Sequence, residues 1–262
     1  MPGADSTIGA IWDLDGTLVD TEMAHFASWR ALLREHGRDL TLEQFKPTFG
    51  LRNDDILVRY FGFSGDAASI AALSERKEEL FRAGLLANGV RLLPGAGELV
   101  KHLHALGARQ AIASSAPPRN IEVLVGLLDI RDRFSAVVSG QEVMHGKPAP
   151  DIMLRAAERL GLPPTCCAVL EDAPAGIAAG HAAGCRTIAI LSTFGRAQLR
   201  AADLIVESFL PTASEARVIA SSKFTKLRDL VSGEVVSAEP VGDHTTFVVP
   251  LKPHSYRVFG LG

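Results

Sequence analysis

Two aspartates stand two residues apart directly after an apolar run, in the segment Ile11-Trp12-Asp13-Leu14-Asp15-Gly16-Thr17. Alternate side chains of an extended chain point to the same side, so a strand that ends here directs both carboxylates toward one site. Gly16 permits a turn that a residue with a Cβ would resist, and Thr17 adds a hydroxyl. The segment therefore predicts a buried strand that ends in a reactive loop.

Composition narrows the kind of protein that carries this loop. The chain has 262 residues, 47% of them hydrophobic and 22% charged, which is typical of a globular protein with a full core. With 27 basic and 30 acidic residues the net charge is −3, so we expect neither a nucleic-acid partner nor a membrane partner. A small metabolite is the partner we expect, with a monomer or weak homodimer as the assembly.

Cysteine usage and the N-terminus bear on the compartment. Cys166, Cys167 and Cys185 have neither the spacing of a zinc site nor the even number of a disulfide framework, and we interpret them as reduced thiols of the core. The first residues lack a cationic segment followed by an apolar one, and no long apolar run is present. We expect a cytoplasmic protein.

Short apolar runs alternate with helical patterns along most of the chain, which indicates a parallel sheet wrapped by helices. Helices are expected at 96–106, 119–128, 150–160 and 176–183. The predicted strands are Ile8–Trp12, Arg109–Ala113, Ala136–Ser139, Cys166–Leu170, Thr187–Leu191 and Leu204–Ile205.

Residues 21–92 break that alternation and predict helices only, at 22–36, 41–48, 53–60 and 70–87. We therefore expect an α/β protein with a Rossmann-like parallel-sheet core, formed by residues 1–20 and 93–210, and an inserted helical cap domain at 21–92. Ligands of open α/β sheets bind beyond the carboxyl ends of the strands, where such an insertion would emerge.

Other strand ends also carry polar residues. The second strand is followed by Ser114 and Ser115, Lys147 precedes Pro148, and the fourth strand ends in Glu171-Asp172. A phosphate that approaches a carboxylate meets like-charge repulsion, which a lysine and a metal ion would neutralise. The inventory predicts phosphoryl transfer.

These motifs, in this order, resemble those of the haloacid-dehalogenase-like phosphatases, over residues 8 to about 210. The segments are Asp13-Leu14-Asp15-Gly16-Thr17, Ser114, Gly146-Lys147-Pro148 and Leu170-Glu171-Asp172. The helical insertion makes the chain similar to sugar-phosphate phosphatases and β-phosphoglucomutases.

The resemblance implies a role for each residue. Asp13 would be the nucleophile that forms an aspartyl phosphate, and Asp15 the general acid and then the base. Ser114 and Lys147 would hold the phosphoryl oxygens, with Thr17 and Ser115 close to the substrate. Mg²⁺ would bind Asp13, the Asp15 carbonyl and Asp172, with Glu171 in a water-mediated or second-shell position.

Each motif also has a structural interpretation. Asp15-Gly16 alone could be an ordinary turn, and Lys147 a solvated loop lysine. Ser114 could cap the helix that follows, with Ser115 serving in its place. Glu171-Asp172 could be a helix N-cap with a charge favourable to the helix dipole.

The helical insertion offers four candidate substrate-binding residues. His25 shares a helix face with Trp29, and either could instead belong to a core. Lys77 has arginines nearby and could simply lie on a solvated face. The segment Gly50-Leu51-Arg52-Asn53-Asp54 resembles a substrate-reading loop of the mutases, except that Asn53 stands where the arginine is expected and Arg52 precedes it.

A second departure from the mutases follows the second strand. A lysine and an asparagine are expected there, whereas this chain has Ala116-Pro117-Pro118-Arg119-Asn120. Arg119 and Asn120 could substitute for them, but the proline pair alters the path of the loop. Both departures favour a phosphatase that acts on a sugar phosphate. A β-phosphoglucomutase-like isomerase is the alternative, and a non-catalytic sugar-phosphate sensor is more remote.

Residues 211–262 form an extension beyond the usual end of such proteins, and we expect it to be short and β-rich. We predict a helix at 214–221 and strands at 233–238, 245–251 and 255–261, with period-two alternation clearest in the last two. These runs resemble the closing strands of β-domains that end many glycoside hydrolases. No chemistry is assigned to the extension.

Overall fold

The computed structural model describes residues 8–48 and 51–210 and six C-terminal segments, 215–221, 226–229, 235–237, 240–241, 244–250 and 259–261. The chain divides into two compact units. The core unit comprises Met1–Val19, Leu92–Pro117 and Ile130–Gly262, and the helical unit comprises Asp20–Arg91 and Pro118–Asp129. The helix after the second strand is therefore grouped with the insertion, whereas the sequence suggested that it belonged to the core.

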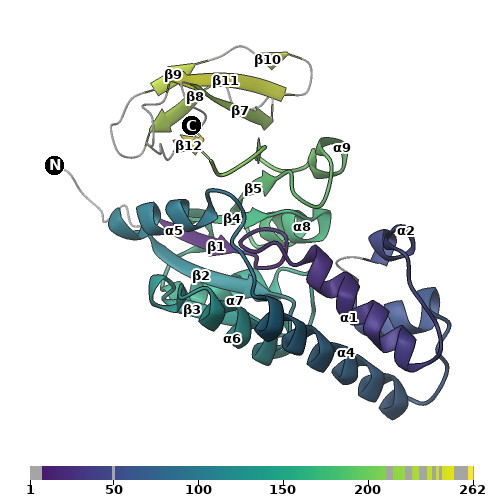
Figure 1. Cartoon of the computed structure of the whole chain (residues 1–262). Helices are drawn as coiled ribbons and strands as arrows, with labels where there is room; N and C mark the ends of the chain where they lie inside the picture. The colour runs from purple at the N-terminus through teal and green to yellow at the C-terminus, as the bar shows by residue number, and fades with distance from the viewer. Residues whose placement is uncertain are drawn as a thin grey trace. The chain divides into compact units, whose positions relative to one another are not determined.

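Six parallel strands form the centre of the core unit, in the order β3-β2-β1-β4-β5-β6 (Figure 1). The predicted α/β architecture is confirmed, and each predicted strand ends within one residue of the observed one. The strands are β1 (Gly9–Trp12), β2 (Arg109–Ser114), β3 (Ala136–Ser139), β4 (Cys167–Glu171), β5 (Arg186–Ile190) and β6 (Leu204–Val206).

Helices connect these strands in the alternation that the sequence predicts. Between the longer helices lie short 3-10 turns at Arg131–Arg133, Gly140–Glu142 and Pro164–Cys166. The helices of the core unit are α5 (Ala96–Ala105), α7 (Asp151–Leu160), α8 (Pro174–Ala182) and α9 (Arg196–Leu199).

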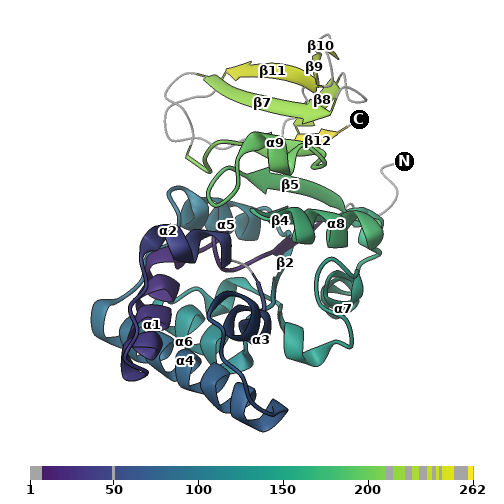
Figure 2. The ribbon, with the colours of Figure 1, turned by 90° about the vertical axis from the view of Figure 1, so that its right-hand side faces the viewer.

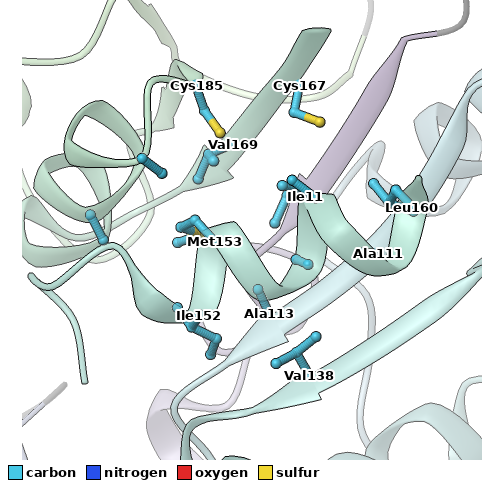
Figure 3. Packing of buried hydrophobic residues seen from close by; sticks show 14 of the residues in the cluster. Ile11, Ala111, Ala113, Val138, Ile152, Met153, Leu160, Cys167, Val169 and Cys185 are labelled. Atoms are coloured by element: carbon cyan, nitrogen blue, oxygen red, sulfur yellow. The ribbon is translucent and has the colours of Figure 1, made fainter. Parts of the chain in front are cut away.

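Side chains alternate along each strand, so the sheet has apolar residues on both faces. A different set of helices covers each face. On one face, Ile11 and Ala111 pack with Met153 of α7 and with the neighbouring strand residue Val169 (Figure 3). On the other face, the Trp12 indole donates to Gln110 Oε1 over 3.0 Å, and Gln110 Nε2 donates to the Val100 carbonyl of α5. Figure 2 shows α5 and α7 on opposite sides of the strands.

Helix α8 lies directly on the sheet because its contact positions are glycine. A Cβ on Gly180 would lie 2.7 Å from Thr187 Cγ2 and 3.3 Å from the Val169 side chain. A Cβ on Gly176 would lie 1.7 Å from Glu171 Oε1. The glycine spacing in this segment therefore serves close helix–sheet packing.

The helical unit contains four successive helical stretches of the insertion together with the helix that follows β2. Its longest helix begins three residues earlier than predicted, because the Asp66 side chain caps it by accepting from Ser69 N. The elements are α1 (Glu22–Glu35), α2 (Leu42–Phe45) with a 3-10 turn (Lys46–Thr48), α3 (Asn53–Asp55) with a π-helix (Ile56–Tyr60), α4 (Ala67–Asn88) and α6 (Pro118–Leu127).

The helical unit has its own apolar core. Trp29, Phe45 and Leu57 are buried in one cluster, and the Trp29 and Phe61 rings meet edge to face at 5.3 Å. Trp29 is therefore a core residue, one of the two interpretations that the sequence left open. The unit can be described as a folded body in its own right.

The C-terminal extension continues the sheet of the core unit. β7 (Glu215–Ser221) pairs antiparallel with β6 and with β11 (His244–Pro250), and β10 (Pro240–Val241) pairs with β11. The predicted helix at 214–221 is therefore wrong, because two neighbouring strands pair with this segment. A separate sheet joins β12 (Phe259–Leu261), β8 (Lys226–Asp229) and β9 (Val235–Ser237).

Parts of the extension predictions fall on residues outside the described segments. Ser214, both ends of 233–238, Leu251 and residues 255–258 belong to this group. The strand predicted at 245–251 corresponds to β11, which begins at His244.

All three cysteines are free, and two of them are buried. Burial raises the pKa of Cys167 to about 11, so this thiol stays protonated. Cys166 is exposed, which corrects the prediction that all three lie in the core, because the residue ends a surface turn before β4 begins. Within the described residues, no helix is long and apolar enough to span a membrane.

The close approach of α8 to the sheet predicts opposite effects for two helical glycines. We expect Gly180→Ala to lower the free energy of unfolding by about 1–3 kcal/mol, because its Cβ overlaps Thr187. Gly84→Ala, whose Cβ would meet no atom within 4 Å in α4, should raise it by up to about 1 kcal/mol. Urea titrations of both variants give the comparison, and equal effects would contradict close packing at Gly180.

Candidate active site

The loop after β1 is held closed by its own backbone. Gly16 N donates to the Val19 carbonyl over 2.8 Å, and Leu18 N and Val19 N both donate to the Leu14 carbonyl. Gly16 has a φ of +80°, a conformation that suits glycine. This turn reverses the chain so that Val19 pairs with Asp15, and Asp15 is half-buried inside the turn.

Lys147 bridges two carboxylates at the carboxyl ends of the adjacent strands β1 and β4. Its Nζ lies 2.5 Å from Asp13 Oδ1 and 2.5 Å from Glu171 Oε1. The side chains of Lys147 and Asp13 are 8% and 10% exposed, so both charges are removed from bulk water. Ordered charge pairs of this kind are strong where solvent is excluded. The solvated-loop interpretation of Lys147 does not hold.

Glu171 is anchored on both oxygens. Its Oε1 accepts from Lys147, and its Oε2 accepts from the backbone amides of Asp172 and Ala173, each over 3.0 Å. Gly176 leaves the space that this carboxylate fills. Glu171 is therefore a fixed acceptor that orients the Lys147 ammonium.

Asp172 lies between the first loop and the loop after β5. Its Oδ1 accepts from Thr17 Oγ1 over 3.3 Å, and a hydrogen bond with the Thr193 side chain also reaches its carboxylate. A Cβ on Gly16 would lie 2.2 Å from Asp172 Oδ2, so only glycine leaves room for this carboxylate. Three segments of the chain thus meet at Asp172.

Burial dominates the ionisation of the cluster. It raises the pKa of Asp172 to about 7, and the charge of Glu171 adds to this effect. Burial likewise holds the pKa of Asp13 well above its usual range, although Lys147 opposes it. Burial alone would lower the pKa of Lys147, but Asp13 and Glu171 outweigh it and keep that pKa above its ordinary value. Three carboxylates therefore face a single ammonium group, which leaves the cluster with an excess of negative charge.

The acidic cluster fits a divalent cation. Asp13, Glu171 and Asp172 each offer an oxygen, and these oxygens lie within 4.8 Å of one another. The donors are carboxylate oxygens without histidine or cysteine, a set that suits Mg²⁺ better than zinc. A cation would also supply the positive charge that the raised pKa values indicate is missing.

The two serines after β2 differ in their surroundings. Ser114 is 1% exposed, and its Oγ accepts from the Ala116 amide over 3.1 Å, as in a serine that stabilises a turn. Ser115 is exposed. The β1–β2 register brings this strand end beside Asp13, since Trp12 is opposite Ile112.

Sequence reasoning missed two residues after β5. Ser192 Oγ donates to the Gly16 carbonyl, and Thr193 contacts Asp172. Their position directly after a predicted strand could have identified them, because ligands bind at the carboxyl ends of strands.

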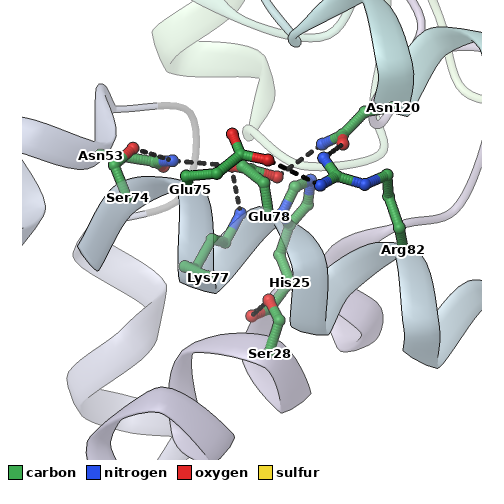
Figure 4. Close-up of polar contacts among 9 residues, drawn as sticks. All are labelled: His25, Ser28, Asn53, Ser74, Glu75, Lys77, Glu78, Arg82 and Asn120. Carbon is green, nitrogen blue, oxygen red and sulfur yellow. Dashed lines mark hydrogen bonds and ion pairs between the residues drawn. The ribbon is translucent and has the colours of Figure 1, made fainter. Parts of the chain in front are cut away.

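Three of the four candidate residues of the helical unit, His25, Asn53 and Lys77, are joined by polar contacts within that unit (Figure 4). Lys77 is 2% exposed, so it does not lie on a solvated face. Its Nζ lies 2.9 Å from His25 Nδ1 and 3.0 Å from Glu78 Oε1. His25 is half-buried, and its ring stacks on Phe81 at 4.1 Å.

Asn53 and Arg52 lie in different environments. Asn53 Nδ2 donates to Glu78 Oε1 over 2.6 Å and to Ser74 Oγ over 3.0 Å. The Arg52 side chain is 81% exposed and pairs with Asp54 over 3.3 Å. Gly50 of this predicted loop lies outside the described residues.

The proline pair after β2 leads into a helix. Pro118 opens α6, where its missing N–H costs no hydrogen bond. Asn120, considered above as a substitute for the expected asparagine, is 1% exposed and contacts Glu78 and Arg82 inside the helical unit.

Comparison with known proteins identifies relatives of this chain. The family model described as haloacid dehalogenase-like hydrolase matches residues 9–184. Hexitol phosphatase A of Escherichia coli (strain K12) is 35% identical over 202 residues, which cover 76% of this chain and 90% of that protein. Fructose-1-phosphate phosphatase YqaB of the same organism is 36% identical over 177 residues, covering 67% and 92%.

A solved structure shares the fold as well. The crystal structure of β-phosphoglucomutase from Clostridium difficile superposes with a TM-score of 0.68 at 25% identity, and the match covers 78% of this chain and 92% of that one. Phosphatases and a phosphomutase are therefore both among the relatives.

The C-terminal segment matches a different family. The model described as a probable glycosyl hydrolase C-terminal domain covers residues 201–261. This agrees with the resemblance seen in the sequence of the extension. The match includes β6, which pairs with β5 of the parallel sheet.

The raised pKa of Asp172 predicts how metal-free protein responds to pH. A carboxyl with a pKa above its unfolded value contributes stability that is complete at low pH and is lost as pH rises through about 7. We expect the Tm of EDTA-treated protein to fall between about pH 5 and pH 8. Mg²⁺ should raise the Tm more at the higher pH, on the order of 5 °C at saturation, because protons compete with the cation.

Differential scanning calorimetry of two variants checks this prediction. Asp172→Asn should weaken both the pH dependence and the Mg²⁺ effect, whereas Asp132→Asn, at an exposed position of the core unit, should retain both. A Mg²⁺ effect that survives in Asp172→Asn would exclude Asp172 as a ligand.

Proposed function

The chain belongs to the haloacid dehalogenase-like hydrolase family, and from that premise we propose that it is a Mg²⁺-dependent phosphatase that hydrolyses a small phosphomonoester, a sugar phosphate, through an aspartyl-phosphate intermediate. One observation carries the proposal most directly. The Asp13 carboxylate is buried and held by Lys147, beside two further carboxylates at the same strand ends. The phosphatase names of the relatives agree with the class of phosphoric monoester hydrolases.

Asp13 and Asp15 divide the chemistry between them. An Asp13 oxygen attacks phosphorus as the bond between phosphorus and the sugar oxygen breaks. Asp15 donates a proton to the departing sugar oxygen. Asp15 then takes a proton from the water that attacks the aspartyl phosphate, which releases phosphate and restores Asp13. Two easier displacements replace one difficult hydrolysis.

Four side chains bind the phosphoryl group, those of Lys147, Ser114, Ser115 and Thr17. The Lys147 ammonium stabilises charge on the phosphoryl oxygens, and the Ser114 hydroxyl donates to one of them. The firm anchoring of Lys147 by Glu171 supports this assignment, since a preorganised cation loses little free energy on reorientation.

Mg²⁺ would be held by Asp13, Asp172 and the Asp15 carbonyl, with Glu171 acting behind them or through water. When bound, the ion offsets the negative charge of phosphate and carboxylates. The saturation of both Glu171 oxygens by Lys147 and backbone amides supports an indirect role for this residue.

The helical cap, residues 21–92, selects the substrate, and His25, Arg52, Asn53 and Lys77 contact its sugar part. A cap that emerges from the sheet end fits this task, because the phosphate machinery lies on the strand ends of residues 1–20 and 93–210. The extension, 211–262, is assigned no part in the reaction.

An isomerase that moves a phosphoryl group between hexose hydroxyls is the second candidate. The relatives named β-phosphoglucomutase favour it, because the first half of both reactions would use the same aspartyl phosphate. At the two places where the sequence departs from the mutases, Asn53 carries no charge with which to bind a second phosphate, and Asn120 is buried and bonded to Glu78 and Arg82. This supports the phosphatase.

Phosphate release from a panel of sugar phosphates tests the main proposal. We expect release with Mg²⁺ and none with EDTA, and Asp13→Asn should lower the rate roughly a thousandfold or more because the nucleophile is lost. Asp132→Asn is the control and should keep the rate. Full activity in EDTA, or in Asp13→Asn, would refute the mechanism.

The acceptor of the phosphoryl group separates the two candidates. Phosphorus NMR of a hexose 1-phosphate with enzyme and Mg²⁺ should show growing free phosphate. Conversion to the 6-phosphate without free phosphate would replace the phosphatase by the isomerase.

A further inference from the structure

Glu78 lies at the centre of the polar contacts inside the helical unit (Figure 4). Its Oε1 accepts from Lys77 Nζ over 3.0 Å and from Asn53 Nδ2 over 2.6 Å, and its Oε2 accepts from Asn120 Nδ2. Asn53 belongs to α3, Lys77 and Glu78 to α4, and Asn120 to α6. One carboxylate therefore fixes side chains from three helices.

This network is buried. Lys77 is 2% exposed, Glu78 is 4% and Asn120 is 1%. Burial by itself would raise the pKa of Glu78, but Lys77 and the hydrogen bond from Asn53 outweigh it and keep that pKa below its ordinary value. Glu78 thus remains a carboxylate and supplies the charge that a buried ammonium requires.

Stability alone gives little reason to retain such a pair. Apolar residues of similar volume can often replace a buried ion pair without loss of stability. The pair is therefore better explained by the geometry that it imposes on its neighbours.

Lys77 sets the protonation of His25. An ammonium group can only donate hydrogen bonds, so the His25 Nδ1 atom, 2.9 Å from Lys77 Nζ, must accept. A neutral imidazole that accepts at Nδ1 carries its proton at Nε2. The ring is also oriented by stacking on Phe81, at an interplanar angle of 10°.

We propose that Glu78 is a positioning residue that holds Lys77 charged, holds His25 through Lys77 as the Nε2–H tautomer, and fixes Asn53, so that these three side chains form one preset recognition element for sugar hydroxyl groups. Preset donors cost less ordering on binding than donors that must reorient. The choice of sugar hydroxyls rests on the proposed function, whereas the tautomer of His25 does not.

The first test measures the tautomer directly. Long-range ¹H–¹⁵N spectra of protein labelled with ¹⁵N-histidine, with His25 assigned by His25→Gln, distinguish the two neutral tautomers. We expect Nε2–H in the wild-type protein. Observation of Nδ1–H would overturn the proposal, and this measurement requires no variant of Glu78 to fold.

A matched pair of variants assigns the effect to Glu78. In Glu78→Gln the buried Lys77 amine loses its counter-charge and gives up its proton more readily, so we expect a mixture of His25 tautomers. Glu79→Gln, one residue along α4, removes a carboxylate that pairs with the exposed Arg76 and should leave the spectrum unchanged. An unchanged spectrum in folded Glu78→Gln would refute the positioning role.

Kinetics test the consequence for the substrate. We expect Glu78→Gln to raise KM for the best sugar phosphate about tenfold, with kcat changed less than KM. Hydrolysis of p-nitrophenyl phosphate, which has no sugar hydroxyls, should stay within about twofold of wild type, as should both activities of Glu79→Gln. Equal losses on both substrates would overturn the recognition role. If wild-type protein hydrolyses neither substrate, the proposed function fails, while the spectra still decide the positioning role.

Discussion

The ammonium of Lys147, shared between Asp13 and Glu171, is the interaction on which the candidate site depends. Buried carboxylates at neighbouring strand ends repel one another, and an ordered cation offsets this repulsion. The rest of the core unit supports that contact. Parallel pairing of β1 with β4 brings the carboxylates together, backbone amides hold Glu171 from behind, and a glycine in α8 leaves space for it.

The helical unit uses the same device for a different purpose. Lys77 and Glu78 form a buried ion pair within it, and the remaining lone pairs of the carboxylate are taken by amide groups of two other helices. In the core unit the spare negative charge fits a cation, whereas in the helical unit the charges balance and the result is a fixed arrangement of donors. We assign the charged centre of the core unit to phosphate and the polar element of the helical unit to the sugar.

The extension shows how far strand pairing can override local preference. Residues 215–221 contain alanine, glutamate and arginine, which favour a helix in isolation, yet they form β7 between β6 and β11. A strand edge presents unpaired N–H and C=O groups, and β6 would be such an edge if β7 were absent. The module similar to a glycosyl hydrolase C-terminal domain therefore joins the sheet of the hydrolase core by hydrogen bonds.

The sequence by itself indicated which strand ends carry the reactive side chains of this protein. Apolar runs followed by polar residues indicated Asp13, Glu171 and Asp172, because the carboxyl ends of parallel strands share one edge of a sheet, and the order of the motifs added Lys147. It could not determine pairwise contacts between segments far apart in the chain. That Lys147 contacts Glu171, that Thr193 reaches Asp172, and that Lys77 is buried against Glu78 depends on packing in three dimensions, which alone sets the distances and the dielectric that govern charged groups.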